Sequence, residues 1–502
     1  MKKILPALLI LLSVVYWYVF ARFVPPPPLA ISRETTYFTD LKEVDGRYSL
    51  VSSINELYHL PPEENALIEY LKMSGTGIVS TDSAEVAEFC SLAGIDPEQL
   101  ASPTLVLQLP SSDAEEFVLN LSEGQHTVFR HPWHEEQFPK IAAIIEANAD
   151  TFALLASMAG KKGFYWPRLQ KYPVWNTPVN RDFRPHHSLR LLLARGMLRL
   201  RSGELRHAWE DLASAGKAAR PLLQSDMITF CLFGVVGMKD TAEAMKMFLH
   251  QQQIDEEFLR QMLVDLDEII FTRGLERAME NETRFFQLSM YLEREDSLWS
   301  LSGLDGTSEK SDFERYVDKN VLCRKVNQFA DEFKKIYSIE DVGERIKGLG
   351  KWENELDQQK TGKSSYQYLI DAILLRYLTP ADQKCTAISE VISDTLMSIS
   401  GPRYSGVLTE MLAVAERFRL LKVAVLMRLH KLKAGDYPAS LDALEVADKQ
   451  ILIDSFSGRQ FNFRSEGKNI MIYSIGPNQR DELGATGEDA ASGDITIMVA
   501  KF

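Results

Sequence analysis

The chain has 502 residues, of which 45% are hydrophobic and 25% charged, and its formal net charge is −14. This composition is that of a globular protein, and the length predicts two or three domains. Nucleic acid is excluded as an expected partner, because contact with phosphates needs a basic stripe and the sequence has none. We interpret the acidity as a well-solvated surface.

The amino terminus carries the first predicted element, a transmembrane anchor over residues 1–24. Two lysines precede a run from Ile4 to Val24 that is apolar except for Ser13 and Arg22, which is about the length a helix needs to cross a bilayer. The run ends in bulky aromatic residues rather than in the small side chains of a cleavage site. We therefore favour an uncleaved anchor over a cleaved signal. The lysines predict a single pass in the inner (cytoplasmic) membrane, with the bulk of the chain extracytoplasmic.

Residues 25–60 are predicted to form a proline-rich spacer, a short extended segment and a first helix. The prolines from Pro25 to Pro28 favour a stiff extended conformation that would lift the rest of the chain off the bilayer. This opening resembles that of a group of uncharacterised bacterial membrane-anchored proteins. The resemblance implies the same membrane topology.

Residues 61–402 are predicted to form an irregular helical body, because a 3.6-residue apolar period dominates them. One capped helix is expected over 141–158, ending at Gly160. The stretch from Leu189 to Arg220 resembles a single tetratricopeptide-type pair, which predicts an αα-hairpin, since a solenoid needs at least three stacked units. Longer helices are expected over residues 188–201, 205–219, 222–250, 254–296 with a break near Gly274, 310–338, 364–378 and 381–399.

No histidine pattern in the body predicts a metal centre or a catalytic site. His131 and His134 are three residues apart with Pro132 between them, whereas a zincin places two histidines four residues apart on a helix. His186 and His187 are expected in the first turn of a helix. With no phosphate loop and no nucleophile motif in the sequence, we predict that the protein is not an enzyme.

The cysteines are scattered and form no C-x-x-C pair, so neither a zinc site nor a redox pair is predicted. Buried free thiols are the favoured interpretation, and a disulfide stays open for a chain outside the cytoplasm. The residues concerned are Cys90, Cys231, Cys323 and Cys385.

Residues 403–502 are predicted to form a small α+β domain, in which a long helix packs on an antiparallel sheet of three or four strands. The helix is expected from about Arg403 to Lys433 and ends at Gly435, because glycine adopts the left-handed conformation of a helix stop. The apolar period then becomes two, which predicts strands near 461–464, 469–474 and 495–499. The whole chain is therefore expected to be mainly α.

Four motifs follow one another in this last region: GDYPASLDAL from Gly435, DSFSGRQFNFR from Asp454, IYSIGPN from Ile472 and EDAASGDITI from Glu488. In order and spacing they resemble the globular head of the major pseudopilin of type II secretion, the G-type subunit. The resemblance implies a pseudopilin-like fold over residues 403–502. This unit follows the helical body, and neither a prepilin cleavage site nor a membrane helix begins it.

The resemblance also implies a calcium site in the loop between the last two strands. By position, the implied ligands are Asn478, Asp489 and Asp494, with Asn478 standing where the family has an aspartate. Calcium takes six to eight oxygens from carboxylates, amides and backbone carbonyls, which an acidic, glycine-rich loop can supply. A solvated acidic loop is the alternative.

We interpret the chain as a membrane-anchored extracytoplasmic scaffold or interaction protein with a pseudopilin-like C-terminal domain. The expected partners are the membrane and an unidentified protein. Two alternatives stay open: a component of a secretion or pilus-like system, and an extracytoplasmic enzyme with its site in the helical body.

Overall fold

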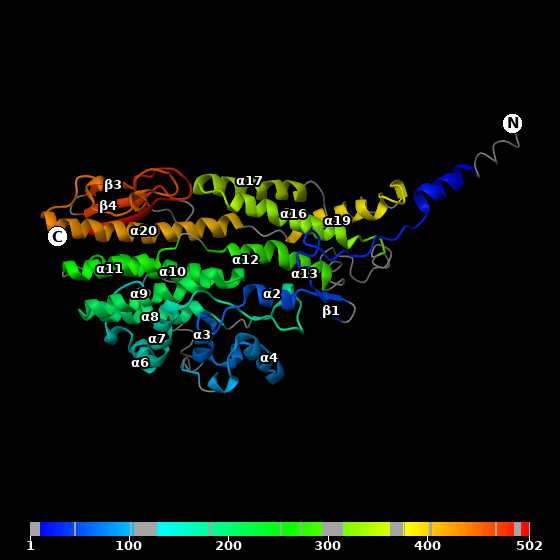
Figure 1. Cartoon of the computed structure of the whole chain (residues 1–502). Helices are drawn as coiled ribbons and strands as arrows, with labels where there is room; N and C mark the ends of the chain where they lie inside the picture. Colours follow the sequence, from blue (N-terminus) through cyan, green and yellow to red (C-terminus); the bar gives the residue numbers. More distant parts are fainter. Residues whose placement is uncertain are drawn as a thin grey trace.

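The protein is mainly helical, with 63% of residues in helices and a small antiparallel sheet near the carboxyl terminus, as the apolar periods predict. The N-terminal helix and this sheet lie at opposite ends of an elongated molecule (Figure 1). The computed structural model describes residues 11–44, 47–100, 103–104, 128–179, 183–251, 254–271, 274–293, 315–361, 375, 377–400, 404–466, 469–485 and 493–500.

The α-helices of the described residues are α2 (Val51–Tyr58), α3 (Leu67–Ser74), α4 (Ser83–Ala93), α6 (Pro139–Ala147), α7 (Ala149–Ser157), α8 (Pro185–Arg201), α9 (Leu205–Ala219), α10 (Ile228–Phe248), α11 (Glu256–Ile269), α12 (Glu276–Glu280), α13 (Gln287–Leu292), α16 (Lys319–Tyr337), α17 (Val342–Thr361), α19 (Lys384–Ser400) and α20 (Tyr404–Ala434). Two π-helices, η1 (Trp17–Ala21) and η8 (Asn281–Phe286), interrupt the α-helical ladder. Short 3₁₀ turns are η2 (Thr76–Ile78), η3 (Pro97–Leu100), η4 (Glu135–Gln137), η5 (Met158–Gly160), η6 (Val174–Asn176), η7 (Arg220–Gln224), η9 (Leu441–Ala443) and η10 (Lys449–Leu452).

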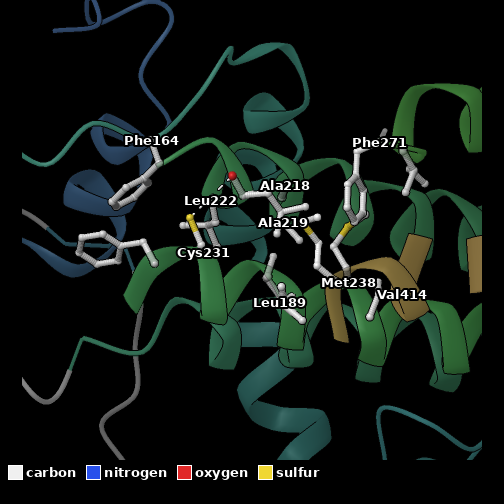
Figure 2. Packing of buried hydrophobic residues seen from close by; sticks show 14 of the residues in the cluster. Phe164, Leu189, Ala218, Ala219, Leu222, Cys231, Met238, Phe271 and Val414 are labelled. Carbon is white, nitrogen blue, oxygen red and sulfur yellow. Dashed lines mark hydrogen bonds between the residues drawn. The ribbon is translucent and has the colours of Figure 1, made fainter. Parts of the chain in front are cut away.

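The predicted αα-hairpin is confirmed as α8 and α9, joined by a turn in which Gly203 has φ +84°. The two helices approach closely because Gly196 has no side chain: a Cβ there would lie 2.9 Å from Leu212 Cδ2. Helix α10 packs on both, and Gly237 gives it the same close contact, with a Cβ placed 2.6 Å from Leu189 Cδ1. Figure 2 shows Leu189 and Met238 within the cluster of buried hydrophobic side chains that forms the core.

Three helix predictions in the body were wrong in their boundaries, one of them the helix over 310–338, since α16 begins at Lys319 and residues 315–318 are not helical. The single helix expected over 141–158 is the pair α6 and α7, bent by 62° at Asn148. The Asn148 side chain donates to the Ile144 carbonyl at 2.8 Å and so replaces a backbone bond at the break. The helix expected from residue 222 begins at Ile228, because Pro221 belongs to the 3₁₀ turn η7.

The break predicted near Gly274 is confirmed, since α11 ends at Ile269 and α12 begins at Glu276. Helix α17 is an element that the sequence analysis did not predict. The predicted helix over 364–378 lies mostly outside the described residues.

The amino-terminal segment differs from the expected free spacer. Residues 25–28 are extended, but they run along α16, where Asn320 Nδ2 donates to the Pro28 carbonyl at 3.0 Å. Asn327 Nδ2 holds the next stretch by donating to the Thr35 carbonyl at 2.8 Å. The segment is therefore packed against the body, and a short hairpin, β1 (Lys42–Val44) with β2 (Arg47–Ser49), follows it.

Across the described part of the chain, no single helix has both the length and the apolar composition of a membrane span. The bent pair α6 and α7 passes that test only when its halves are joined. A shorter apolar helix covers Leu11–Ala21, and residues 1–10 of the predicted anchor lie outside the described residues.

The C-terminal sheet has the order β3 (Asn462–Glu466), β4 (Asn469–Ser474), β5 (Ile495–Ala500), all antiparallel. This confirms the predicted strands. Leu441 and its neighbours form the short turn η9 after the stop of α20 at Gly435, which has φ +83°.

Helix α20 packs on the body and on the sheet at the same time. On the body side Glu410 Oε1 accepts from Lys239 Nζ at 2.7 Å, and Arg428 donates to the Leu249 carbonyl at 2.9 Å. On the sheet side Arg419 donates to Ser455 Oγ at 2.6 Å. Figure 2 shows Val414 of α20 inside the body's apolar cluster.

This two-sided packing explains why apolar residues surround the helix instead of forming one stripe. Body and sheet consequently share one hydrophobic core, which reaches from Leu50 to Val499. The buried apolar residues of α20 are Tyr404, Leu408, Met411, Leu412, Ala413, Val414, Ala415, Phe418, Leu420, Leu421, Val423, Ala424, Val425, Leu426, Met427 and Leu429.

Candidate functional site

Two of the three implied calcium ligands in the acidic loop between β4 and β5 lie among the described residues. Asn478 lies in the turn that follows β4, and Asp494 immediately precedes β5. Asp489 lies outside the described residues. Glycines make the loop possible: at Gly484, with φ +84°, a Cβ would lie 2.1 Å from Met471 Sδ, so no other residue fits without rearrangement.

Asp494 is a buried carboxylate, 3% exposed, with one oxygen satisfied and one not. Its Oδ2 accepts a hydrogen bond from the Gly484 backbone N–H at 2.7 Å. Within the described residues no donor reaches its buried Oδ1, nor the buried Oε2 of Glu482. Burial, together with the neighbouring Glu482 carboxyl, raises the pKa of Asp494 to about 6. The loop thus brings together two carboxyl groups that repel each other when both are ionised.

Such a pair fits either a bound cation or a shared proton. Asn478 is already engaged: its Oδ1 accepts from the Arg480 backbone N–H at 2.9 Å, and its amide donates to Glu482 Oε1 at 2.9 Å. Among the residues that the structure describes, no group of three or more His, Cys, Asp or Glu side chains gathers at one point. Asp494 and Glu482 each offer a buried oxygen that no described donor reaches, the kind of ligand that calcium takes. Asn478 would bind a cation through the Oδ1 that also accepts from Arg480.

A second feature is a cleft of about 540 Å³ in the helical body, between α12 with η8 on one wall and α16 on the other. Its charges balance, with three carboxylates and three cations around two aromatic rings. The lining residues are Glu276, Arg277, Glu280, Thr283, Ala330, Phe333, Lys334, Tyr337, Ser338, Glu340 and Arg345.

The wall of this cleft contains two unusual backbone conformations. Leu275, directly before α12, has φ +70°, which a branched side chain rarely adopts, and its N–H donates to the Leu223 carbonyl at 3.1 Å. The segment Asn281–Phe286 is a π-helix. Both features concentrate at functional sites in proteins, so the cleft is a candidate binding site.

A buried charged cluster lies behind that wall. Arg168 and Asp226, 1% and 2% exposed, form an ion pair with Nη2 and Oδ2 2.5 Å apart. Burial and the Asp226 charge raise the pKa of Glu282 to about 7, although the Arg168 charge opposes the shift. Burial also raises the pKa of Tyr58 and of the Cys231 thiol.

The cluster and the cleft share η8 but not the same side chains. Thr283 lines the cleft, whereas Glu282 interacts with Arg168 and Asp226 and is not among the lining residues. A carboxyl that titrates near neutral pH is what a general acid or base requires. Here that carboxyl is not among the side chains that line the cleft.

The predicted positions of His186 and His187 and the predicted buried free thiols are confirmed. His134 Nε2 accepts from Arg201 Nε at 2.7 Å, which leaves that nitrogen engaged within the protein. His186 and His187 lie in the first turn of α8, and burial lowers their pKa values to about 3 and 4. The four thiols are free and buried: Cys90, Cys231, Cys323 and Cys385.

Sequence reasoning missed the Arg168–Asp226–Glu282 cluster, because its members are far apart in the chain and no spacing connects them. Glu482 belongs to the acidic loop that the sequence already indicates as a possible calcium site, four residues after Asn478. No protein-family model, no curated protein and no solved structure matches this chain.

Proposed function

We propose that this chain is an envelope-anchored, non-enzymatic scaffold or interaction protein. Residues 1–24 hold it in the inner membrane, and its bulk lies outside the cytoplasm. The observation that carries the proposal is the two-sided packing of α20, which joins the helical body and the C-terminal sheet in one core. A sheet fixed in this way is presented at a constant distance and orientation from the anchor.

The positions of the two ends support the same proposal. The N-terminal helix and the sheet are at opposite ends of the molecule (Figure 1). Strands β3 and β5 are the two edges of the sheet, and edge strands offer backbone groups to a partner. The protein partner expected from the sequence would therefore bind at the end away from the membrane.

The same packing argues against a subunit of a secretion or pilus-like system. Assembly of copies through α20 would need an exposed apolar face on that helix. Its apolar residues are instead buried against the body on one side and the sheet on the other.

The anchor and its orientation are tested by expressing the full chain in a bacterium with alkaline phosphatase fused after Phe502. The fusion should be enzymatically active, because the phosphatase works only outside the cytoplasm. The protein should stay in the membrane pellet after alkaline carbonate extraction, and deletion of residues 1–24 should release it. An inactive fusion, or full-length protein in the supernatant, would contradict the proposal.

Calcium is proposed as the ligand of the acidic loop, bound by Asp494 and Glu482 together with Asn478 and Asp489, the further ligands that the resemblance implies. A cation that binds only the folded state stabilises it, by about 2.7 kcal/mol at one hundred times its dissociation constant. Thermal unfolding of the full chain should shift upward with calcium relative to chelator. Asp494→Asn should remove the shift, and the exposed control Glu445→Gln should keep it. An equal midpoint with and without calcium would contradict the proposed calcium site.

The cleft beside η8 supports a second candidate, a site in the helical body for a polar ligand or substrate. Its balanced charges and two aromatic rings suit a small zwitterionic molecule. Thermal-shift screening of such compounds on the full chain tests this candidate. A stabilising compound should lose its effect in Phe333→Ala and keep it in Leu432→Ala, an exposed control outside the cleft.

A further inference from the structure

We infer that the helical body itself rests on the bilayer through Tyr377 and Leu378, at the point where the N-terminal helix leaves the membrane. The inference depends on the proposed anchor and adds a second membrane contact to it. It assigns a lipid surface as the partner of a patch on the body.

Exposed large apolar side chains gather at one end of the molecule. Leu378 is the most exposed of those described, at 68%, and Tyr377 is 53% exposed. Isolated exposed apolar residues are ordinary, but a contiguous group marks an interaction surface. The other members of the group come from the N-terminal helix and the residues after it: Leu11, Leu12, Val14, Val15, Tyr16, Trp17, Tyr18 and Phe23.

Hydrogen bonds show where the body meets this helix. The Ala381 N–H donates to the Val19 carbonyl at 2.7 Å, and Lys384 Nζ donates to the Phe20 carbonyl. Further toward the amino terminus, the Tyr16 hydroxyl donates to the Tyr377 carbonyl at 3.3 Å. The start of α19 and the residues before it therefore lie along the helix, not beyond its end.

The depth of the patch follows from these contacts. Tyr16 and Val19 both belong to the proposed anchor, and a helix rises about 1.5 Å per residue, so Tyr16 lies about 4.5 Å deeper in the bilayer than Val19. The Tyr377 carbonyl contacts the Tyr16 hydroxyl, and a helical side chain tilts toward the amino terminus, so Tyr377 lies deeper than the Ala381 contact. If the apolar run crosses the bilayer, Tyr377 and Leu378 reach the lipid before the rest of the body does.

The chemistry around the patch is that of a membrane–water interface. Arg22 lies over the Tyr18 ring at 4.4 Å, and Arg315 lies over the Phe23 ring at 5.8 Å. Aromatic rings with neighbouring cations favour the headgroup region, where the ring faces hydrocarbon and the cation faces phosphate. The patch continues the apolar surface of the N-terminal helix, so a bilayer covers both at once, whereas a protein partner would have to share the site with lipid.

The test places an environment-sensitive fluorophore, nitrobenzoxadiazole, on an introduced cysteine. The native thiols are buried, so only the new one reacts. Three single variants of the full chain are compared: Leu378→Cys on the patch, Trp17→Cys on the N-terminal helix, and Val264→Cys on α11, which is 52% exposed and lies at the far end. Each is reconstituted in phosphatidylethanolamine–phosphatidylglycerol vesicles, with or without lipids that carry a shallow spin-label quencher.

The label at Leu378→Cys should shift to the blue and lose intensity in quencher vesicles, whereas the label at Val264→Cys should do neither. A quenched label at Trp17→Cys beside an unquenched one at Leu378→Cys would overturn the inference and leave the anchor in place. Unquenched labels at both positions would contradict the anchor as well. Circular dichroism of each variant checks that the fold is intact.

Discussion

Replacing Glu282 by glutamine should stabilise the protein above neutral pH and remove part of its pH dependence. In the folded protein the pKa of this carboxyl is raised from 4.5 to about 7. Burial is the main cause, and Asp226 adds to it, because two carboxylates then compete for Arg168. Glutamine keeps the shape of the protonated acid and cannot ionise.

The direction of the pKa shift of Glu282 determines whether stability rises or falls with pH. A carboxyl whose pKa is higher in the folded state binds its proton more tightly there, so its contribution to stability is full below about pH 4.5. That contribution is lost as the pH rises through about 7. At 1.36 kcal/mol per pKa unit, the shift corresponds to about 3 kcal/mol at most.

The measurement is urea unfolding of the full chain in detergent, followed by tryptophan fluorescence, at pH 5 and pH 8. The stability of Glu282→Gln relative to wild type should increase by about 2.5 kcal/mol between these values, because part of the full effect is already lost at pH 5. Glu276→Gln, an exposed position on α12 just before η8, is the matched control and should follow wild type. If wild type and Glu282→Gln change in parallel with pH, the pKa of half-buried Glu282 is not raised in the folded protein.

Three further predictions concern close helix packing at a glycine, a buried ion pair, and the hydrogen bonds that hold the segment before β3. Gly237→Ala, where a Cβ would lie 2.6 Å from a leucine methyl, should lower the unfolding free energy by about 1–3 kcal/mol, whereas Gly406→Ala, with open space around it, should raise it by about 0.5–1 kcal/mol in the same denaturation assay. Arg168→Met leaves a buried carboxylate unpaired and should cost about 3–5 kcal/mol, while Arg260→Met, in an exposed pair on α11, should cost less than about 1 kcal/mol; equal losses would refute the difference. Arg419→Leu removes the donor to two backbone carbonyls of the segment before β3, so hydrogen exchange should accelerate over residues 448–456 and stay unchanged in α8.

The sequence predicted the helical elements well where a local signal ends them. The glycine turn after α8 and the glycine stop of α20 are both where the sequence places them, because positive φ favours glycine. The bend at Asn148 was missed, because asparagine also occurs within ordinary helices. Only the structure shows that the Asn148 side chain donates to the Ile144 carbonyl at the break. Periodicity alone does not distinguish a bent pair from a straight helix.

One of the two candidate sites could be predicted from the sequence and the other could not. The acidic loop could be found from sequence, since its carboxylates are close together in the chain. Arg168, Asp226 and Glu282 could not, because only the fold brings α12–η8 against the loop before α8 and the start of α10. A buried ion pair of this kind has no sequence spacing, and its members look like surface charges until their burial is known.

The distribution of apolar residues around helix α20 indicates what the helix packs against. The sequence analysis took its apolar residues as one stripe facing a small sheet, which is the usual arrangement of an α+β unit. A helix whose apolar residues surround its axis needs cover on all sides, and a three-stranded sheet covers only one. The second cover is the body, through α10 and α11.

The same argument connects the two ends of the molecule. The segment after the N-terminal helix is bound along α16 and α19, and the sheet is bound through α20. Neither end is therefore connected to the body by a flexible linker. A force or a displacement at one end is transmitted to the other through packed helices. A scaffold between a membrane and a distant partner needs that stiffness, whereas an enzyme whose site is enclosed in the body does not.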